Sequence, residues 1–301
     1  MKTLNQMICK FSLAIPLIFL QFVADAQVTE KISNTNTLKL GFRVDAQPFS
    51  YRDASGSIKG YSVDICNHIA ESIKINLNKP NLKIETVLVN SNDRFSALKS
   101  GKIDILCGAS TITMTRRETM SFSIPIFLSG MGAMVNEDAP SRLKALLLGQ
   151  EPEYRPTWRA SYGQILKERT LTALKGTTAE KWLKEDDFNI FSKFETVDTY
   201  KEGVDRLLNK TSDVLFGDRA VLLDLATRHE NADKLKIIDR QFTYESIALA
   251  FQDNDKKLHL LIDRALSKLY QSDEIVLIYG RHFGELDETA QSLFTRAAIP
   301  E

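Results

Sequence analysis

The first half of the chain alternates apolar and polar positions in two different periods. Residues 37–43 place Leu38, Leu40 and Phe42 at every second position, which predicts a half-buried strand. The next apolar residues recur every three or four positions, which predicts a helix with Ser62 as its N-cap. Strand and helix then alternate in the order of a parallel α/β sheet. The expected elements are strands at 37–43, 82–89 and 103–106, helices at 62–77 and 94–100 with Asn92 capping the second, and a hairpin turn at 53–56.

The second half continues the same two patterns. The Gly-rich apolar run 127–135 predicts another strand, and Leu258, Leu261 and Leu266 lie on one face of a strongly amphipathic helix at 256–270. The chain therefore holds enough elements for two separate cores. Further elements are expected as strands at 171–174, 213–218 and 244–251 and as helices at 179–184, 204–208 and 219–228.

The first 26 residues have the order of a secretory signal peptide. Lys2 and Lys10 precede an apolar run at 11–23, and Ala24-Asp25-Ala26 forms a cleavage site of small residues. The apolar run is too short to span a bilayer. We expect cleavage after Ala26 and export to the periplasm; the alternative is an uncleaved N-terminal anchor.

Charge and length narrow the classes of function. Cleavage removes two lysines and one aspartate from 39 basic and 39 acidic residues, which leaves a net charge near −1. Such a chain has no general attraction to nucleic acid or anionic lipid. After residue 26 no stretch approaches the roughly 20 apolar residues of a membrane-spanning helix. We therefore expect a soluble, monomeric protein of two lobes without a nucleic-acid partner.

Two cysteines remain after cleavage. Cys66 lies early in a predicted helix and Cys107 ends a predicted strand in the same half of the chain. An oxidising compartment permits a disulfide between them. A Cys66–Cys107 bridge is expected, and two small buried thiols are the alternative.

Polar residues gather where the strands of the first half end. The stretch 104–117, DILCGASTITMTRR, runs from a strand into a loop of small hydroxyl residues and then into an arginine pair that begins with Arg116. Hydroxyl and backbone N–H groups bind anions, and an arginine donates two parallel hydrogen bonds to a carboxylate. Arg43, Ser91 and Arg94 fall at the same strand-end edge, where open α/β sheets bind ligands. The hypothesis is a carboxylate-binding pocket; the alternative is a strand-to-helix connection with solvated arginines.

A second candidate anion site lies in the other half. Thr177 and Thr178 follow Gly176 at the start of a predicted helix, where free N–H groups meet the positive end of the helix dipole. From the residues alone, a plain N-cap is the simpler interpretation. Asp218, at the end of a predicted strand, is a candidate cap for the helix that follows.

Several segments together resemble the bacterial extracellular solute-binding proteins of polar amino acid ABC transporters. They are GFRVDAQPFSYRD, GYSVDIC, RFSALKSGKIDILCGASTITMTRR and FSIPIF. Within that family the resemblance is strongest to glutamate/aspartate-binding proteins, because of the GYS-D segment, the Ser-x-x-Arg of Ser91 and Arg94, and the Cys-Gly before the hydroxyl loop. The resemblance implies a type II periplasmic binding fold of two α/β lobes, each a mixed, mostly parallel sheet flanked by helices. Two hinge strands join the lobes, and 127–135 is expected to be one of them.

The resemblance also implies roles for residues of the first lobe. Arg116 corresponds to the family arginine that binds the ligand α-carboxylate, with Thr111 adding a hydroxyl and an N–H. Ala109 stands where many relatives have serine, so only its backbone contributes. The remaining correspondences are Phe49 and Tyr51 as an aromatic wall and Arg43 and Arg94 as arginines that reach an acidic side chain.

In the second lobe the resemblance implies that Thr177 and Thr178 bind the ligand and that Asp218 pairs with its ammonium group. Two departures stand out. Tyr200 falls where the most similar acidic-ligand binders carry histidine, which puts a glutamate or aspartate preference in doubt. An insertion at about 149–170 contains three aromatic residues and is either a lid, a docking patch or a surface excursion. The lobes are expected at 37–130 with 247–301, and at 131–246.

An enzyme needs a nucleophile with a base, a metal set or a phosphate loop. The four histidines are scattered without ligand spacing, and there is no G-x-S-x-G or P-loop motif. No catalytic residue, metal or cofactor is therefore expected. The resemblance implies capture of a free polar amino acid, with acidic ones as candidates, by hinge closure and its delivery to an inner-membrane ABC permease. A stand-alone ligand sensor and a periplasmic dehydratase of the same fold are the alternatives.

Overall fold

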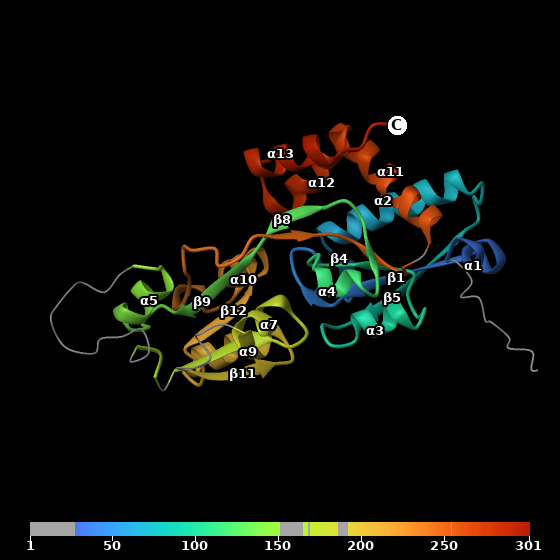
Figure 1. The fold of residues 1–301 in the computed structure, drawn as a ribbon. Helices are drawn as coiled ribbons and strands as arrows, with labels where there is room; N and C mark the ends of the chain where they lie inside the picture. Colours follow the sequence, from blue (N-terminus) through green and yellow to red (C-terminus); the bar gives the residue numbers. More distant parts are fainter. Residues whose placement is uncertain (1–27, 151–164, 168, 186–191, 254) are drawn as a thin grey trace, which may run out of the picture.

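The computed structural model describes residues 28–150, 165–167, 169–185, 192–253 and 255–301. Two lobes, each with a five-stranded sheet, lie side by side and are linked by extended chain (Figure 1). The fold class expected from the sequence is confirmed. The expected signal peptide and most of the 149–170 insertion lie outside the described residues.

The first sheet has the strand order β5-β1-β6-β15-β7. β1 pairs in parallel with β5 and β6, as the alternating strands and helices predict, whereas β15 returns from the other lobe and pairs antiparallel with β6 and β7. The sheet is therefore mixed because its last strands arrive late in the chain. Its strands are β1 (Thr37–Arg43), β5 (Lys83–Val89), β6 (Ile105–Cys107), β7 (Ser121–Phe122) and β15 (Ala250–Phe251).

Helices cover both faces of this sheet (Figure 1). On one face, α2, α11, α12 and α13 form a helical layer, and α3 lies on the other. The disulfide between Cys66 of α2 and Cys107 of β6 ties that layer to the sheet. A small sheet of β2, β3 and β4 contains the expected hairpin turn. The bounds are α1 (Val28–Thr35), β2 (Asp45–Ala46), β3 (Ser50–Arg52), β4 (Ile58–Lys59), α2 (Tyr61–Asn76), α3 (Arg94–Lys99), α4 (Met114–Arg117), α11 (Lys256–Tyr270), α12 (Asp273–Phe283) and α13 (Glu288–Ala297).

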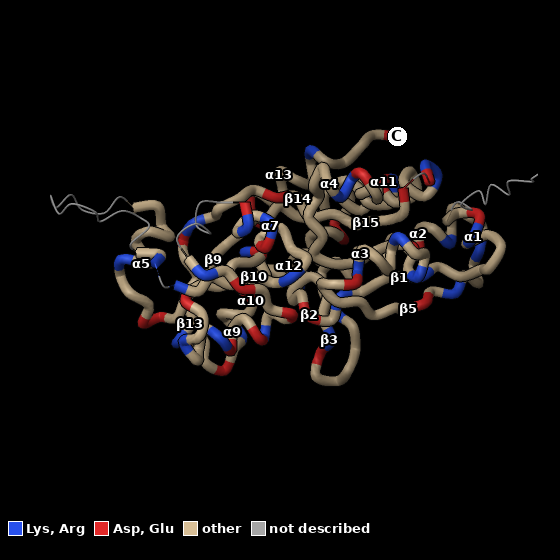
Figure 2. Tube along the Cα trace, turned by 60° about the horizontal axis from the view of Figure 1, so that its bottom comes forward, with Lys and Arg blue, Asp and Glu red and all other residues tan. Residues whose placement is uncertain are grey.

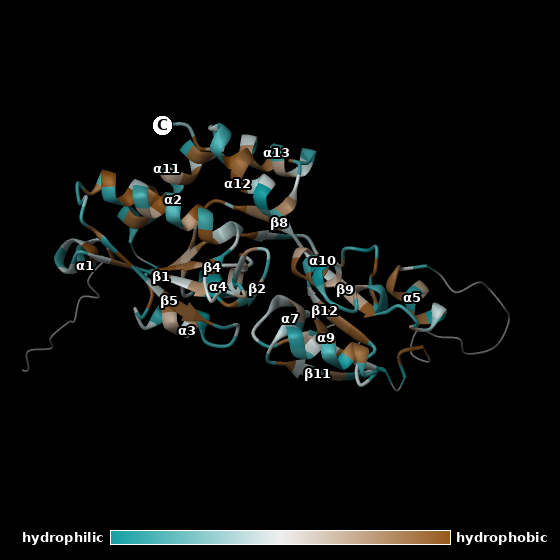
Figure 3. Cartoon of the chain, turned by 180° about the vertical axis from the view of Figure 1, so that it is seen from behind, coloured by the Kyte–Doolittle hydropathy of each residue, from teal (hydrophilic) through white to brown (hydrophobic). Residues whose placement is uncertain are grey.

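The second sheet has the order β11-β10-β12-β9-β13. Its first three strands are parallel, and β9 and β13 are antiparallel to their neighbours, so this lobe repeats the mixed plan of the first. Figure 3 shows apolar strands in the middle of the lobe and hydrophilic residues on its outer turns. The elements are β9 (Met131–Asn136), α5 (Ser141–Leu147), β10 (Thr170–Leu174), α7 (Thr178–Glu185), β11 (Lys193–Val197), α9 (Tyr200–Leu208), β12 (Val214–Asp218), α10 (Arg219–Arg228), η1 (Ala232–Lys234) and β13 (Leu235–Ile237).

Two antiparallel segments connect the lobes. β8 (Phe127–Ser129) pairs with β14 (Glu245–Ile247), and the chain passes from β8 into β9 through Gly130. A Cβ on Gly130 would lie 1.8 Å from the Thr243 carbonyl oxygen. Glycine therefore allows the two connecting segments to touch, and it divides the single strand expected at 127–135 into two.

Two of the predicted helix caps are wrong. α2 begins at Tyr61, and its N-cap is Gly60, at φ 134. The N–H groups of Tyr61 and Ser62 donate to the carbonyls of Pro48 and Phe49, at 2.9 Å each, so the loop before the hairpin replaces a side-chain cap. The Ser62 hydroxyl donates instead to the Gly108 carbonyl.

The second wrong cap is Asn92. The N-cap of α3 is Asp93, whose side chain accepts from the Asn90 N–H and makes no capping bond to the helix, and the Asn92 amide donates to Asp198 of the other lobe. Asn92 thus bonds across the interface between the lobes and does not cap α3.

Charges of both signs are spread over both lobes (Figure 2). This distribution agrees with the near-neutral net charge of the sequence. Among the described residues, no helix has the length and hydrophobicity needed to cross a membrane.

Candidate ligand-binding site

The strand-end loops of the two sheets meet each other. Ser91, after β5, donates from its hydroxyl to the Lys175 carbonyl after β10 at 2.7 Å. The Asn92 amide donates to the Asp198 carboxylate at 3.0 Å, and Arg94 Nη2 donates to the Gly176 carbonyl at 2.9 Å. The edge at which the sequence places the candidate residues is therefore the edge at which the lobes touch.

Two predicted arginines share one aromatic ring. The guanidinium of Arg94 lies 4.2 Å from the ring centre of Phe95, and that of Arg116 lies 4.7 Å from it. Arg116 Nη1 donates to the Thr111 carbonyl at 2.7 Å. Burial lowers the pKa of Arg116 to about 10, while the charge of Glu245 acts in the opposite direction. Sequence reasoning missed Phe95, whose apolar side chain carries no distinguishing signal.

A carboxylate of the chain itself occupies the space beside Arg116. Glu245 Oε2 accepts from the Thr111 hydroxyl at 2.8 Å and from the Thr178 hydroxyl at 2.9 Å, one from each lobe. Its other oxygen accepts from Thr243 at 2.7 Å. From the sequence, Glu245 was expected only as part of a strand. The available signal was an acidic residue at the start of the apolar run ESIALAF.

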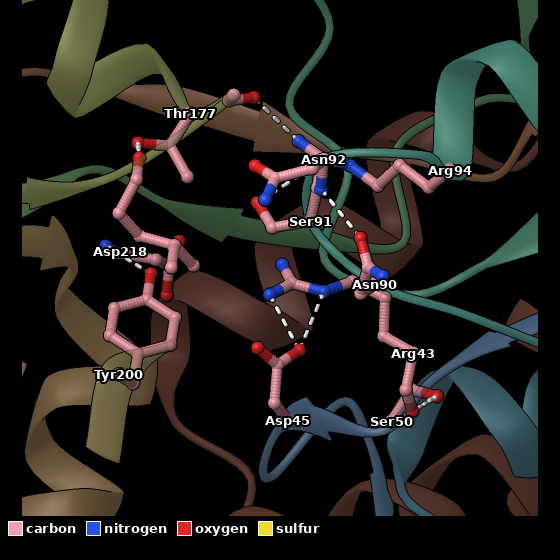
Figure 4. A network of polar contacts seen from close by, with 12 residues as sticks. Arg43, Asp45, Ser50, Asn90, Ser91, Asn92, Arg94, Thr177, Tyr200 and Asp218 are labelled. Atoms are coloured by element: carbon pink, nitrogen blue, oxygen red, sulfur yellow. Dashed lines mark hydrogen bonds and ion pairs between the residues drawn. The ribbon is translucent and has the colours of Figure 1, made fainter. Parts of the chain in front are cut away.

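Arg43 is paired within its own lobe. Its Nε and Nη2 donate to the same oxygen of Asp45, at 3.1 and 2.8 Å. The Arg43 side chain is 2% exposed and that of Asp45 is 18% exposed. Figure 4 shows this pair facing Tyr200 and Asp218 of the second lobe.

Tyr200 and Asp218 form the opposite side. The Asp218 N–H donates to the Tyr200 hydroxyl at 3.4 Å, and Asp218 Oδ1 accepts from the N–H groups of Ala220 and Val221 at 3.0 and 3.2 Å. Asp218 is thus the N-cap of α10. Burial, together with the charge of Glu245, raises the pKa of Asp218 from 3.8 to about 6. Burial also raises the pKa of the Tyr200 phenol, which keeps it neutral.

The two threonines at the start of α7 have different partners. The Thr177 hydroxyl donates to the Leu174 carbonyl and accepts from the Glu180 N–H, so it caps the helix. Thr178 points to Glu245, as described above.

The remaining predicted residues lie outside this polar network. Phe49 is fully buried in an aromatic cluster with Tyr61, Phe127 and Phe283, at centroid distances of 5.1 to 6.4 Å. Tyr51 is on the half-exposed hairpin, and Ala109 packs against the core of the first lobe.

A separate surface pocket of about 450 Å³ lies between α11 and the C-terminal residues, and none of the predicted residues lines it. In the described part of the chain, no group of three or more His, Cys, Asp or Glu side chains is arranged to hold a metal ion.

Two α/β lobes that meet along their strand ends, with charged and hydroxyl groups from both lobes between them, define a two-lobed ligand-binding protein. The chain belongs to the bacterial extracellular solute-binding proteins, family 3, whose family model matches residues 38–285.

Named relatives agree with this assignment. The chain is 26% identical over 267 residues to the glutamate/aspartate import solute-binding protein of Escherichia coli K12, covering 86% of this chain and 80% of the relative. It is similar to the solved cysteine-binding protein of Campylobacter jejuni, with 26% identity, a TM-score of 0.69 and coverage of 87% and 96%. The ancestral amino acid-binding protein AncCDT-1, a precursor of cyclohexadienyl dehydratase, has the same fold, with 23% identity, a TM-score of 0.70 and coverage of 85% and 99%.

Proposed function

We propose that this protein is the amino acid-binding component of an ABC importer. The observation that carries the proposal is the environment of the Glu245 carboxylate, which accepts a hydroxyl hydrogen bond from each lobe beside Arg116. A site that holds an internal carboxylate in this way has the chemistry to hold the α-carboxylate of an amino acid.

In this proposal Asp218 binds the ammonium group of the ligand. Its carboxylate comes from the second lobe, and Arg116 comes from the first. A zwitterion that bridges the two lobes contacts both only when they are closed. Since a ligand shifts a conformational equilibrium only by its differential affinity, such contacts favour the closed state.

Export and delivery follow from the same role. The signal-peptide pattern at 1–26 and the family assignment support a periplasmic location and an inner-membrane ABC permease as the partner. On this proposal the protein binds and releases its ligand unchanged and is not an enzyme.

The decisive experiment is calorimetric titration of the exported protein with the twenty amino acids, repeated for Arg116→Ala. At least one amino acid should bind the wild type, and Arg116→Ala should reduce that affinity beyond detection, because the carboxylate then loses its charged partner. Arg117→Ala is the matched control, since Arg117 is the exposed neighbour on the same short helix. Absence of any amino acid ligand, or equal losses in both variants, would reject the proposal.

One observation favours a second candidate, a dehydratase. Asp218 has a pKa of about 6 and can hold a proton near neutral pH, as a general acid must. Incubation with prephenate or arogenate tests this directly. Turnover that is lost in Asp218→Asn would replace the transport assignment.

A further inference from the structure

The pairing of Arg43 with Asp45 bears on the charge of the ligand, and this inference rests on the proposed function. We propose that the site selects an amino acid with an uncharged side chain, because Asp45 already neutralises the arginine that a side-chain carboxylate needs. The resemblance to glutamate/aspartate-binding proteins favoured an acidic ligand. The two hypotheses therefore predict opposite relative affinities for acidic and uncharged amino acids.

The Arg43–Asp45 pair is local and therefore does not depend on lobe closure. The two residues are two positions apart, at the end of β1 and the start of β2, and two guanidinium nitrogens donate to one carboxylate oxygen. Two N–H groups bonded to one oxygen leave three of the five guanidinium N–H groups outside this pair, so a ligand carboxylate that bonded to Arg43 would share a cation that Asp45 already neutralises. Two carboxylates would then lie close together around one guanidinium in a largely buried position, which is unfavourable.

Arg94 has little capacity left for a second carboxylate. Its Nη1 donates to the carbonyl and the hydroxyl of Ser91, and its Nη2 donates to the Gly176 carbonyl. Only Nε is buried without a partner. These three bonds leave the Nε–H and one N–H of Nη2, so a ligand carboxylate would share Arg94 with the Ser91 and Gly176 groups that it already joins. Arg94 thus serves to join the lobes.

The buried and half-buried charges at the interface are balanced without a ligand. Leaving aside the exposed Asp198, three arginines, Arg43, Arg94 and Arg116, lie among three carboxylates, Asp45, Asp218 and Glu245. Tyr200 adds no charge, because burial keeps its phenol protonated. A zwitterion with an uncharged side chain preserves this balance, whereas glutamate or aspartate adds one uncompensated negative charge and lysine or arginine adds one positive charge.

The test compares ligands of the same shape and different charge. Calorimetric titrations measure the affinities of glutamine against glutamate and of asparagine against aspartate, next to the screen of all twenty amino acids. The tightest ligand of the wild type should have an uncharged side chain, and each amide should bind at least tenfold more tightly than its acid. A wild type whose tightest ligand is glutamate, aspartate, lysine or arginine overturns the inference and leaves the proposed function intact. Absence of any ligand rejects the proposed function.

The Asp45→Asn variant tests whether Asp45 causes the preference for an uncharged side chain. The asparagine keeps the size of the side chain and removes its charge, so the affinity for glutamate relative to glutamine should rise at least tenfold. Asp53→Asn is the matched control, because Asp53 pairs with Lys59 within the hairpin and not with an arginine of the site. An unchanged glutamate-to-glutamine ratio in a folded Asp45→Asn protein refutes the role of Asp45. Should that variant fail to fold, the wild-type comparison still decides the inference.

Discussion

Replacing Asp218 with asparagine should abolish ligand binding and, above pH 6, stabilise the ligand-free protein. The asparagine side chain keeps the oxygen that caps α10, where Asp218 accepts from the N–H groups of Ala220 and Val221. What the substitution removes is the charge, which pairs with the ligand ammonium in the proposed function. Asp218→Asn therefore separates function from stability at one side chain.

The magnitude follows from the pKa of Asp218, about 6 in the folded protein against an ordinary value of 3.8. Below pH 3.8 the carboxyl is protonated in both the folded and the unfolded chain. As the pH rises, the unfolded chain ionises first, so the stability contributed by protonated Asp218 is lost as the pH passes through about 6. The full loss corresponds to about 3 kcal/mol, an upper value because the side chain is partly exposed.

Urea unfolding at pH 4, 5, 6, 7 and 8 measures this effect. The free energy of unfolding of Asp218→Asn should match that of the wild type near pH 4 and exceed it by up to about 3 kcal/mol at pH 7 to 8. Asp53→Asn is a control of opposite sign, since hydrogen bonds from Lys59 and Ser55 lower the pKa of Asp53. Its stability should fall below that of the wild type at neutral pH and converge with it in acid. A difference between Asp218→Asn and the wild type that does not change with pH would refute the reasoning.

Two further substitutions test the framework around the site. Reducing the Cys66–Cys107 disulfide, or replacing both cysteines with serine, should lower the free energy of unfolding by about 3 to 4 kcal/mol, because the bridge closes a loop with a sequence separation of 41. Equal urea midpoints with and without reductant would contradict this expectation. Ser91→Ala removes the hydroxyl that donates to Lys175 across the interface, and the loss of one such bond should weaken ligand binding about three- to tenfold by calorimetry. Ser55→Ala, on the exposed hairpin, should leave the affinity unchanged.

Elements with a strong internal period were predictable from the sequence. The helix at 256–270 has the bounds of α11, and the strand at 37–43 has those of β1, because each buries one regular face. The caps of α2 and α3 were not predictable. Ser62 is inside α2 because carbonyls of the preceding loop already satisfy the first N–H groups of that helix. That arrangement depends on tertiary structure, which spacing along the chain does not encode.

The candidate site likewise has residues that the sequence predicts and partners that only the fold brings to them. Strand ends placed Arg43, Ser91 and Arg94 at one edge, and the lobes do meet there. Their partners arise from the fold. Glu245 is more than 60 residues from Thr178 and more than 130 from Thr111, so no local pattern joins them. Even the neighbouring Asp45 was missed, because the resemblance assigned Arg43 to a ligand and left no reason to look for an internal partner.

The position of Glu245 also limits how much the hydroxyl groups of Thr111 and Thr178 contribute to discrimination among amino acids. Thr111 and Thr178 already donate to the Glu245 carboxylate where the two lobes meet, so each hydroxyl has a partner there without a ligand. A ligand α-carboxylate that takes over these donors does so for every amino acid alike, so the exchange with Glu245 contributes little to the difference in binding free energy between amino acids. An unbalanced charge at a buried interface changes the binding free energy much more. Discrimination among amino acids should therefore follow side-chain charge and the Arg43–Asp45 pair, and the threonines should set how readily the lobes close.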